Sequence, residues 1–196
     1  MSDPLFDTSD GNTPLDEDET LGLRLTWVRT RGDLNAAEAA NILDARRAIR
    51  SPAPDDVLDD LWLRQLHHRM FGDVWDWAGS YRISERNIGI AWVEVPAAVR
   101  NLVQDARAWT EGAEQQMAVA RFHHRLVAIH PFPNGNGRHS RAAADHLSNA
   151  LGIPPPTWGA RTYTDTTELR AAYLAALRTA DRDPNQLEPL VEFTWS

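Results

Sequence analysis

The sequence contains no cysteine and no lysine. Without cysteine, the protein has no disulfide bond, no thiolate metal ligand and no cysteine nucleophile. Because lysine is absent, all 20 basic side chains are arginines, which excludes the phosphate-binding lysine of a P-loop protein or of a protein kinase. A phosphate site in this chain must therefore use arginine, histidine and backbone N–H groups.

Long apolar segments and an excess of positive charge are also lacking. No apolar run approaches the ~20 residues that span a bilayer, and residues 1–4 do not begin a secretion signal. We therefore expect a cytoplasmic protein without membrane contact. The net charge of −8 opposes binding to a nucleic-acid backbone, so we expect no direct nucleic-acid partner.

The remaining composition predicts one globular domain preceded by an acidic arm. The 42% hydrophobic and 24% charged residues are typical of a globular protein, and 196 residues suffice for one hydrophobic core. Residues 1–20 carry seven acids and no base, which predicts an N-terminal arm without a core of its own. The folded domain is assigned to residues 21–196, with its core at about 60–150 and C-terminal helices at 164–193.

Hydrophobic periodicity predicts a mainly α-helical domain. One helix is expected from Asp33 to about Arg50, and a second from Pro54 to Gly72 with Leu58, Leu61, Trp62, Leu66 and Met70 on its apolar face. Further apolar stripes are Val99-Leu102-Val103-Ala106-Trp109, Val119-Phe122-Leu126-Ile129, Ala143-Leu147-Ala150-Leu151 and Leu169-Tyr173-Ala176-Leu177-Ala180. Residues 83–95 are the exception, because β-branched residues around an internal glycine predict a small β-hairpin.

Residues 130–141, His-Pro-Phe-Pro-Asn-Gly-Asn-Gly-Arg-His-Ser-Arg, carry the chemistry. Their glycines alternate with asparagines directly before a helix, and such a loop can direct backbone N–H groups at an anion. Arg138 and Arg141 follow in the first helical turn, where the helix dipole disfavours cations unless an anion arrives. Arginine binds phosphate bidentately, so we predict a phosphate-chain site. His130 beside it is the leading general base.

This segment resembles the signature of the Fic (Fic/Doc) family, His-Pro-Phe-x-(Asp or Glu)-Gly-Asn-Gly-Arg-x-x-Arg, and departs from it at one position. Residues 77–82, Trp-Ala-Gly-Ser-Tyr-Arg, are similar to the Trp-Ala-Gly-x-x-Arg stretch that precedes the flap of that family. The resemblance thus covers about residues 60–150. Residues 13–16 and 31–35 further resemble the branch called mobile mystery protein B.

The resemblance implies a Fic-type helical bundle with a β-hairpin flap over the active site, and protein adenylyltransferase (AMPylation) activity. His130 would deprotonate a Ser, Thr or Tyr hydroxyl of a target protein, which attacks the α-phosphate of ATP. The phosphates would be bound by Gly135, Asn136, Gly137, Arg138 (β and γ) and Arg141 (γ). The flap would dock an extended target segment along Asn87, Ile88, Gly89, Ile90, Ala91, Trp92 and Val93, or serve only as a cover.

The one departure is Asn134, which stands where the family has an acid that helps to hold Mg²⁺. A neutral oxygen binds this cation more weakly, so we expect an indirect metal contact and a higher Mg²⁺ demand, or a different donor. Many family members also carry an inhibitory helix with the signature Ser/Thr-x-x-x-Glu-Gly/Asn, which no segment here fits fully. Residues 13–17 and 164–168 have its spacing but not its final residue, so autoinhibition stays open at this point. Of the two segments, the one in the acidic arm is the better candidate, because such an arm can be mobile.

Three alternatives stay open at this point. The first is a Doc-like protein kinase, although the Gly135-Asn136-Gly137-Arg138 sequence resembles the AMP-transferring form. The second is a transferase that uses another nucleotide donor, such as UTP, GTP or a choline nucleotide. The third is a non-catalytic, phosphate-binding regulatory module. The resemblance also suggests a toxin–antitoxin setting, with a small antitoxin or a DNA-binding partner encoded nearby.

Overall fold

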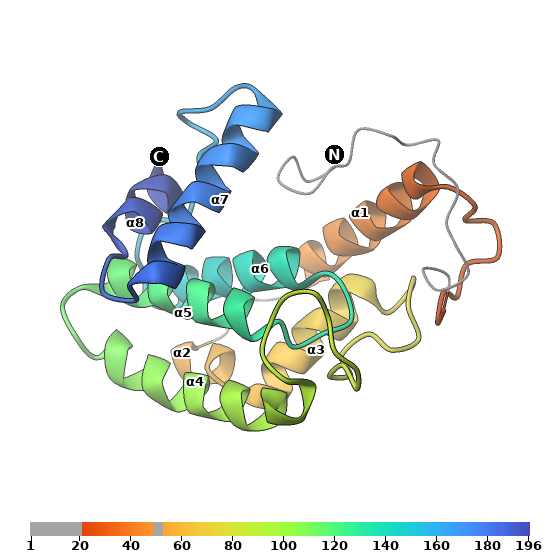
Figure 1. Ribbon diagram of the computed structural model, residues 1–196, viewed down its shortest axis with the longest axis horizontal. Coiled ribbons are helices and arrows are strands. Elements are labelled where there is room, and N and C mark those ends of the chain that lie inside the picture. Colours follow the sequence, from red (N-terminus) through yellow and green to blue (C-terminus); the bar gives the residue numbers. More distant parts are fainter. Residues whose placement is uncertain (1–20, 49–52) are drawn as a thin grey trace.

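The computed structural model describes residues 21–48 and 53–196, and these ranges are mainly helical (Figure 1). The predicted acidic arm, residues 1–20, lies outside the described residues. The helices are α1 (Arg31–Ala48), α2 (Pro54–Val57), α3 (Asp60–Phe71), α4 (Val95–Thr110), α5 (Gln115–Ile129), α6 (Asn136–Ala150), α7 (Thr166–Arg182) and α8 (Glu188–Trp195), with a short 3₁₀ helix η1 (Trp92–Glu94) before α4. The prediction of a mainly α-helical fold is confirmed.

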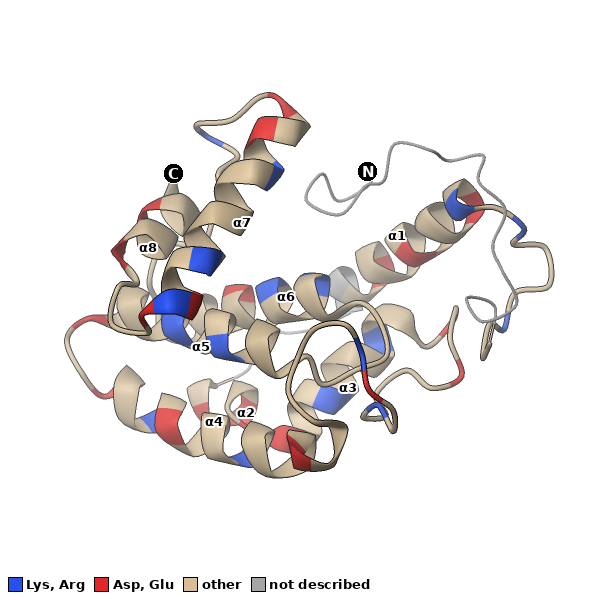
Figure 2. Ribbon diagram, in the orientation of Figure 1, with Lys and Arg blue, Asp and Glu red and all other residues tan. Residues whose placement is uncertain are grey.

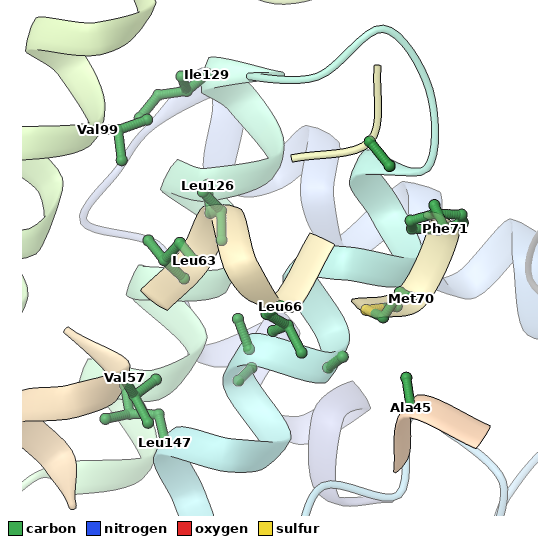
Figure 3. Close-up of a cluster of buried hydrophobic side chains, with 14 of the residues drawn as sticks. Ala45, Val57, Leu63, Leu66, Met70, Phe71, Val99, Leu126, Ile129 and Leu147 are labelled. Carbon is green, nitrogen blue, oxygen red and sulfur yellow. The ribbon is translucent and has the colours of Figure 1, made fainter. Parts of the chain in front are cut away.

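Helices α5 and α6 lie at the centre and are joined by the short loop that carries the histidine motif (Figure 1). Helix α4 packs on α5, α1 packs on α3, and α3 contacts α6. One hydrophobic core lies among helices α1 to α6, and Figure 3 shows side chains from these helices converging in it. A second core lies under α7 and α8 and reaches α5 through Ala120.

Helix α1 begins earlier than expected, because Thr30 rather than Asp33 caps it. Thr30 Oγ1 accepts a hydrogen bond from the Asp33 N–H (3.2 Å), and Asp33 Oδ2 accepts one from the Thr30 N–H (3.0 Å). This reciprocal pair is a capping box, which satisfies two N–H groups that the helix leaves unpaired. A further bond from the Arg29 N–H also lowers the pKa of the Asp33 carboxyl.

The single helix expected over Pro54–Gly72 is in fact two helices, α2 and α3. The chain leaves the helical conformation at Leu58, and Asp59 starts α3 by accepting a hydrogen bond from the Trp62 N–H (2.9 Å). The apolar face expected for one continuous helix is therefore partly wrong. Leu58, Leu66 and Met70 are buried as expected, whereas Leu61 is 58% exposed.

The expected β-hairpin over residues 83–95 is not confirmed. No residue from 83 to 95 lies in a β-strand, and the isolated bridge between Leu23 and Trp75 is outside this segment. Residues 83–91, called the flap segment below, form an irregular loop that leads into η1. The physical reason is that the buried side chain of Arg82 takes the place of a second strand. It donates hydrogen bonds to the backbone carbonyls of Ser84 and Ile90, which a hairpin would pair with backbone N–H groups.

None of the helices in the described ranges combines the length and the apolar character needed to cross a bilayer. Acidic and basic positions are interspersed along the ribbon (Figure 2).

Candidate functional site

His130 stands at the junction between α5 and the motif loop, in a left-handed backbone conformation (φ 54°, ψ 61°). This conformation costs a residue with a side chain roughly 1–2 kcal/mol, so neighbouring contacts must hold it. The His130 N–H donates to the Leu126 carbonyl (3.3 Å), and the His130 carbonyl accepts from Arg82 Nε (2.7 Å). These contacts turn the chain sharply out of α5 and fix the place of the imidazole.

The motif loop is held closed by the side chain of Asn136. Asn136 Oδ1 accepts a hydrogen bond from the Phe132 N–H (2.9 Å), and Asn136 Nδ2 donates to the Phe132 carbonyl (2.8 Å). Asn136 was expected in the anion-binding loop, and its side-chain amide holds that loop in shape through these two hydrogen bonds. Its backbone N–H remains available to an anion, because the first N–H groups of a helix have no partner within the helix.

Gly135 occupies the N-cap of α6 with a left-handed backbone (φ 77°). A Cβ at this position would lie 2.6 Å from the ring of Phe71, so only glycine fits. The chain therefore passes directly against α3 before it turns into α6, and the unpaired N–H groups of α6 start at this turn. This is the backbone arrangement expected of an anion site.

Asn134, the position expected to assist a metal ion, is exposed, and its Oδ1 accepts a hydrogen bond from the Gly135 N–H (2.7 Å). The described residues contain no group of three or more histidine, aspartate or glutamate side chains that could hold a metal. The single side-chain oxygen of Asn134 suits a Mg²⁺ ion that is held mainly by water molecules and nucleotide phosphates. It does not suit a metal site built from protein ligands alone.

His67 supports the motif loop from α3 and was not identified from the sequence. Its ring stacks on Phe132 with 3.8 Å between ring centroids. Its Nε2 donates to the Asn134 carbonyl (3.1 Å), and its Nδ1 accepts from the Gly79 N–H (3.0 Å). Burial, assisted by His139, holds the pKa of His67 well below its ordinary value, so the ring stays neutral and can accept at Nδ1. Its position one helical turn after Leu63 and directly after Leu66 is the sequence feature that could have indicated a buried side chain.

Arg138 forms a buried ion pair that the sequence did not predict. Its Nη2 lies 2.6 Å from Glu38 Oε2 of α1, and the two side chains are 15% and 3% exposed. Glu38 Oε1 also accepts from Trp75 Nε1 (2.7 Å), and the Arg138 guanidinium lies 4.9 Å from the centre of the Phe71 ring. The arginine assigned to the β- and γ-phosphates thus has a carboxylate partner in this structure.

Arg141, the second motif arginine, is buried against other helices. Its guanidinium lies 5.7 Å from the centre of the Tyr173 ring of α7, and its charge contributes to the lowered pKa of His123 in α5. Arg138 contacts α1 and α3 instead, so the two arginines, which were expected on one helix face, contact different neighbours. Their joint contact with a phosphate chain stays a prediction.

The flap segment covers His130. Gly89 adopts φ +100°, and a Cβ there would lie 2.6 Å from the Cβ of His130. Burial lowers the pKa of His130 to about 4, with smaller contributions from the charges of Arg82 and Arg86. The imidazole is therefore neutral near pH 7 and can accept a proton.

Residues 57–148 match the Fic/DOC family, and this span contains the motif loop, both motif arginines and the 77–82 stretch. These residues form a Fic domain. The family resemblance expected from the sequence is thereby confirmed, whereas the branch assignment stays a prediction.

The Fic domain has curated relatives with named activities. Over 99 residues it is 34% identical to a probable protein adenylyltransferase, y4lH, of Sinorhizobium fredii, covering 45% of this chain and 52% of the relative. Over 114 residues it is 30% identical to a uridine 5′-monophosphate transferase of Xanthomonas campestris, covering 47% of this chain and 20% of the relative. The chain thus spans about half the length of the first relative and a fifth of the second.

Solved Fic structures share the fold of most of this chain. The N-terminal Fic domain of Bep8, a VirB-translocated effector of Bartonella sp. 1-1C, aligns with a TM-score of 0.72 at 15% identity, covering 92% of this chain and 91% of that one. At this identity the likeness shows the fold alone.

Proposed function

We propose that this protein transfers AMP from ATP to a Ser, Thr or Tyr hydroxyl of a target protein. The observation that carries the proposal is the position of His130, a neutral imidazole fixed directly before the turn that opens the N-terminus of α6. A proton acceptor and an anion site in immediate succession are what nucleotidyl transfer to a hydroxyl needs. The named activity of the Sinorhizobium relative supports the same reaction.

In the proposed reaction, His130 accepts the proton of the target hydroxyl as its oxygen bonds to the α-phosphorus of ATP. The bond from that phosphorus to the oxygen bridging to the β-phosphate breaks, and pyrophosphate leaves with the electron pair. The target then carries AMP through a phosphodiester, and His130 holds the proton until solvent removes it. Because such transfers depend mainly on positioning and charge stabilisation, the protein needs no covalent intermediate.

The backbone N–H groups of Asn136 and Gly137 would face the phosphates, and Gly135, whose N–H is bound by Asn134 Oδ1, would shape the turn beside them. Arg138 and Arg141 would offset the phosphate charge. Asn134 would hold a nucleotide-bound Mg²⁺ through water, and the ion would supply positive charge beside the phosphates. The Arg138 guanidinium carries five N–H donors, and Glu38 binds it at Nη2. We propose that a phosphate oxygen replaces Glu38 at Nη2, so that ATP binding competes with this ion pair.

The target would dock on the flap segment and η1. Ile88 and Val93 are each 63% exposed there, and such exposed apolar side chains can contact a partner. The irregular backbone of the flap segment is not paired with a second strand within the described ranges, so its exposed groups are open to an extended peptide.

A different nucleotide donor is the second candidate, because the Xanthomonas relative is named a uridine 5′-monophosphate transferase. The test is label transfer to proteins of a host lysate from ATP, UTP or GTP, each carrying the isotope in its α-phosphate, with Mg²⁺ present. Transfer from ATP supports adenylylation. Transfer from UTP or GTP alone would keep the reaction class and change the donor, and a lack of transfer from any donor would favour a non-catalytic module.

A further inference from the structure

Arg82 is a buried arginine whose contacts are almost all with backbone carbonyls around the site. Its side chain is fully enclosed, and Nε donates to the His130 carbonyl (2.7 Å). Nη1 donates to the Ser84 carbonyl (3.1 Å), and Nη2 donates to the Ile90 carbonyl and, more weakly, to that of Ile129 (3.5 Å). One guanidinium thus joins the last two residues of the α5 junction to both ends of the flap segment.

Only arginine can make this set of contacts. Its rigid planar group carries five N–H donors, whereas the lysine ammonium has three and lacks the fixed fork. The backbone N–H of Arg82 adds a bond to the Pro131 carbonyl (3.0 Å), so the residue is attached to the motif loop at both its main chain and its side chain.

The flap segment and His130 are in close contact at the place where Arg82 binds both. A Cβ on Gly89 would lie 2.6 Å from His130 Cβ and 3.1 Å from Arg82 Nη2, so the three residues touch without spare room. A shift of the flap segment must therefore move His130 or break the Arg82 contacts. The flap segment, which is proposed to hold the target, and His130, which is proposed to deprotonate it, are thus expected to move together.

We propose that Arg82 is a positioning residue that fixes the distance between the docked target and the imidazole of His130. This inference rests on the proposed function for its meaning in catalysis, since it assumes that the target docks on the flap segment. Its structural part, the coupling of His130 to the flap segment through one guanidinium, stands without that assumption.

The test compares Arg82→Lys and Arg82→Gln with a matched control, Arg64→Gln. Arg64 also supports this region, since Nε donates to the Gly79 carbonyl (2.9 Å) and its guanidinium lies 5.3 Å from the centre of the Tyr81 ring. These contacts are with Gly79 and Tyr81 rather than with His130, so the Arg64→Gln variant reports on general loosening of the loop. Circular dichroism and thermal unfolding establish that each variant is folded.

Two readouts that need no turnover decide the coupling. Histidine NMR titration, assigned with a His130→Asn variant, measures the pKa of His130, and hydrogen exchange measures protection of residues 84–91. Burial is the main cause of the low pKa of His130, followed by the charges of Arg82 and Arg86. Both variants should therefore raise this pKa by loosening the flap segment, and Arg82→Gln should raise it more because it also removes a positive charge. In both variants the backbone N–H groups of residues 84–91 should exchange at least about tenfold faster than in the wild type, because neither side chain has the guanidinium that binds both ends of the flap segment.

The control Arg64→Gln should leave both the pKa of His130 and the flap exchange unchanged. The proposal would be overturned if the flap amides of both Arg82 variants exchange at the wild-type rate, or if Arg64→Gln speeds this exchange as much as the Arg82 variants do. If Arg82→Gln does not fold, Arg82→Lys still decides it through exchange.

With an active enzyme, Arg82→Lys should lower kcat/KM for the target about tenfold or more while ATP affinity stays constant. If no transfer activity exists, the NMR and exchange results still report on the coupling, so the two failures are distinguishable.

Discussion

Arg138 of α6 donates to Glu38 of α1 with 2.6 Å between Nη2 and Oε2, inside a nearly closed environment. The family resemblance assigns this arginine to the β- and γ-phosphates, and Glu38 is thus an internal anion at a position where a nucleotide anion is expected. A second bond from Trp75 fixes the carboxylate in place. We propose that Glu38 competes with a nucleotide phosphate for the Arg138 guanidinium.

We predict that Glu38→Gln binds a non-hydrolysable ATP analogue about tenfold more tightly than the wild type, a gain of about 1.4 kcal/mol. Glutamine keeps an acceptor for Trp75 and removes the charge that competes for Arg138. Without nucleotide, the variant should be less stable by about 2 kcal/mol, because a charged hydrogen bond is lost. Isothermal titration calorimetry and urea unfolding measure the two effects.

The matched control is Glu111→Gln, which makes the same change in net charge at an exposed position at the end of α4. It should change neither affinity nor stability beyond about 0.5 kcal/mol. Unchanged or weaker nucleotide binding by Glu38→Gln would mean that Glu38 orients Arg138 for phosphate binding and does not compete with it.

Gly89→Ala should remove at least about nine tenths of the transfer activity. The added methyl group meets His130 Cβ at 2.6 Å in a backbone region that favours glycine, so the flap segment must move away from the imidazole. Gly112→Ala is the control, since its Cβ would meet only the Trp109 carbonyl, at 3.4 Å. Equal activity of the two variants, measured as initial rates of label transfer, would contradict the contact between Gly89 and His130.

Asn136→Ala should destabilise the protein by about 2 kcal/mol or more, because it leaves the buried N–H and carbonyl of Phe132 without partners. Urea unfolding measures the change, and the exposed Asn101→Ala on α4 serves as its control, with an expected effect within about 0.5 kcal/mol. If the two variants are equally stable, Asn136 does not close the motif loop.

Stability should fall as the pH drops below about 6.5. Burial lowers the pKa of His123 to about 3 and that of His139 to about 4, from an ordinary value of 6.5. As the pH falls, the unfolded chain therefore binds protons first, and each of these two groups costs up to about 1.4 kcal/mol per pH unit between pH 6.5 and its folded pKa. Urea unfolding at pH 7 and 5.5 tests this, and equal free energies of unfolding at the two pH values would refute it.

The helices that sequence periodicity placed well are those whose signals are local. The stripe Val119-Phe122-Leu126-Ile129 of α5 is buried, and so is Leu169-Tyr173-Ala176-Leu177-Ala180 of α7. An apolar stripe that repeats every 3.6 residues predicts both the helix and its buried face, whichever element covers that face. The sequence alone therefore suffices to place these helices. The break between α2 and α3 escaped this reading because one acidic cap at Asp59 decides it.

The site residues that the sequence missed are those whose role depends on distant partners. Glu38 lies 100 positions from Arg138, and His67 lies 67 positions from Asn134, so no local pattern connects them. The flap segment failed as a hairpin for the same reason, since one buried guanidinium satisfies carbonyls that a second strand was expected to bind. Motif residues could be identified singly, whereas the contacts that regulate or position them required the fold.

The most direct test of adenylyl transfer uses ATP labelled in either its α- or its γ-phosphate, with host lysate as acceptor, Mg²⁺, and folded wild-type or His130→Ala protein. The account predicts protein labelled from the α-phosphate only, and only when His130 is intact. Label from the γ-phosphate would make the protein a kinase, and α-label that persists in His130→Ala would show that His130 is not the base.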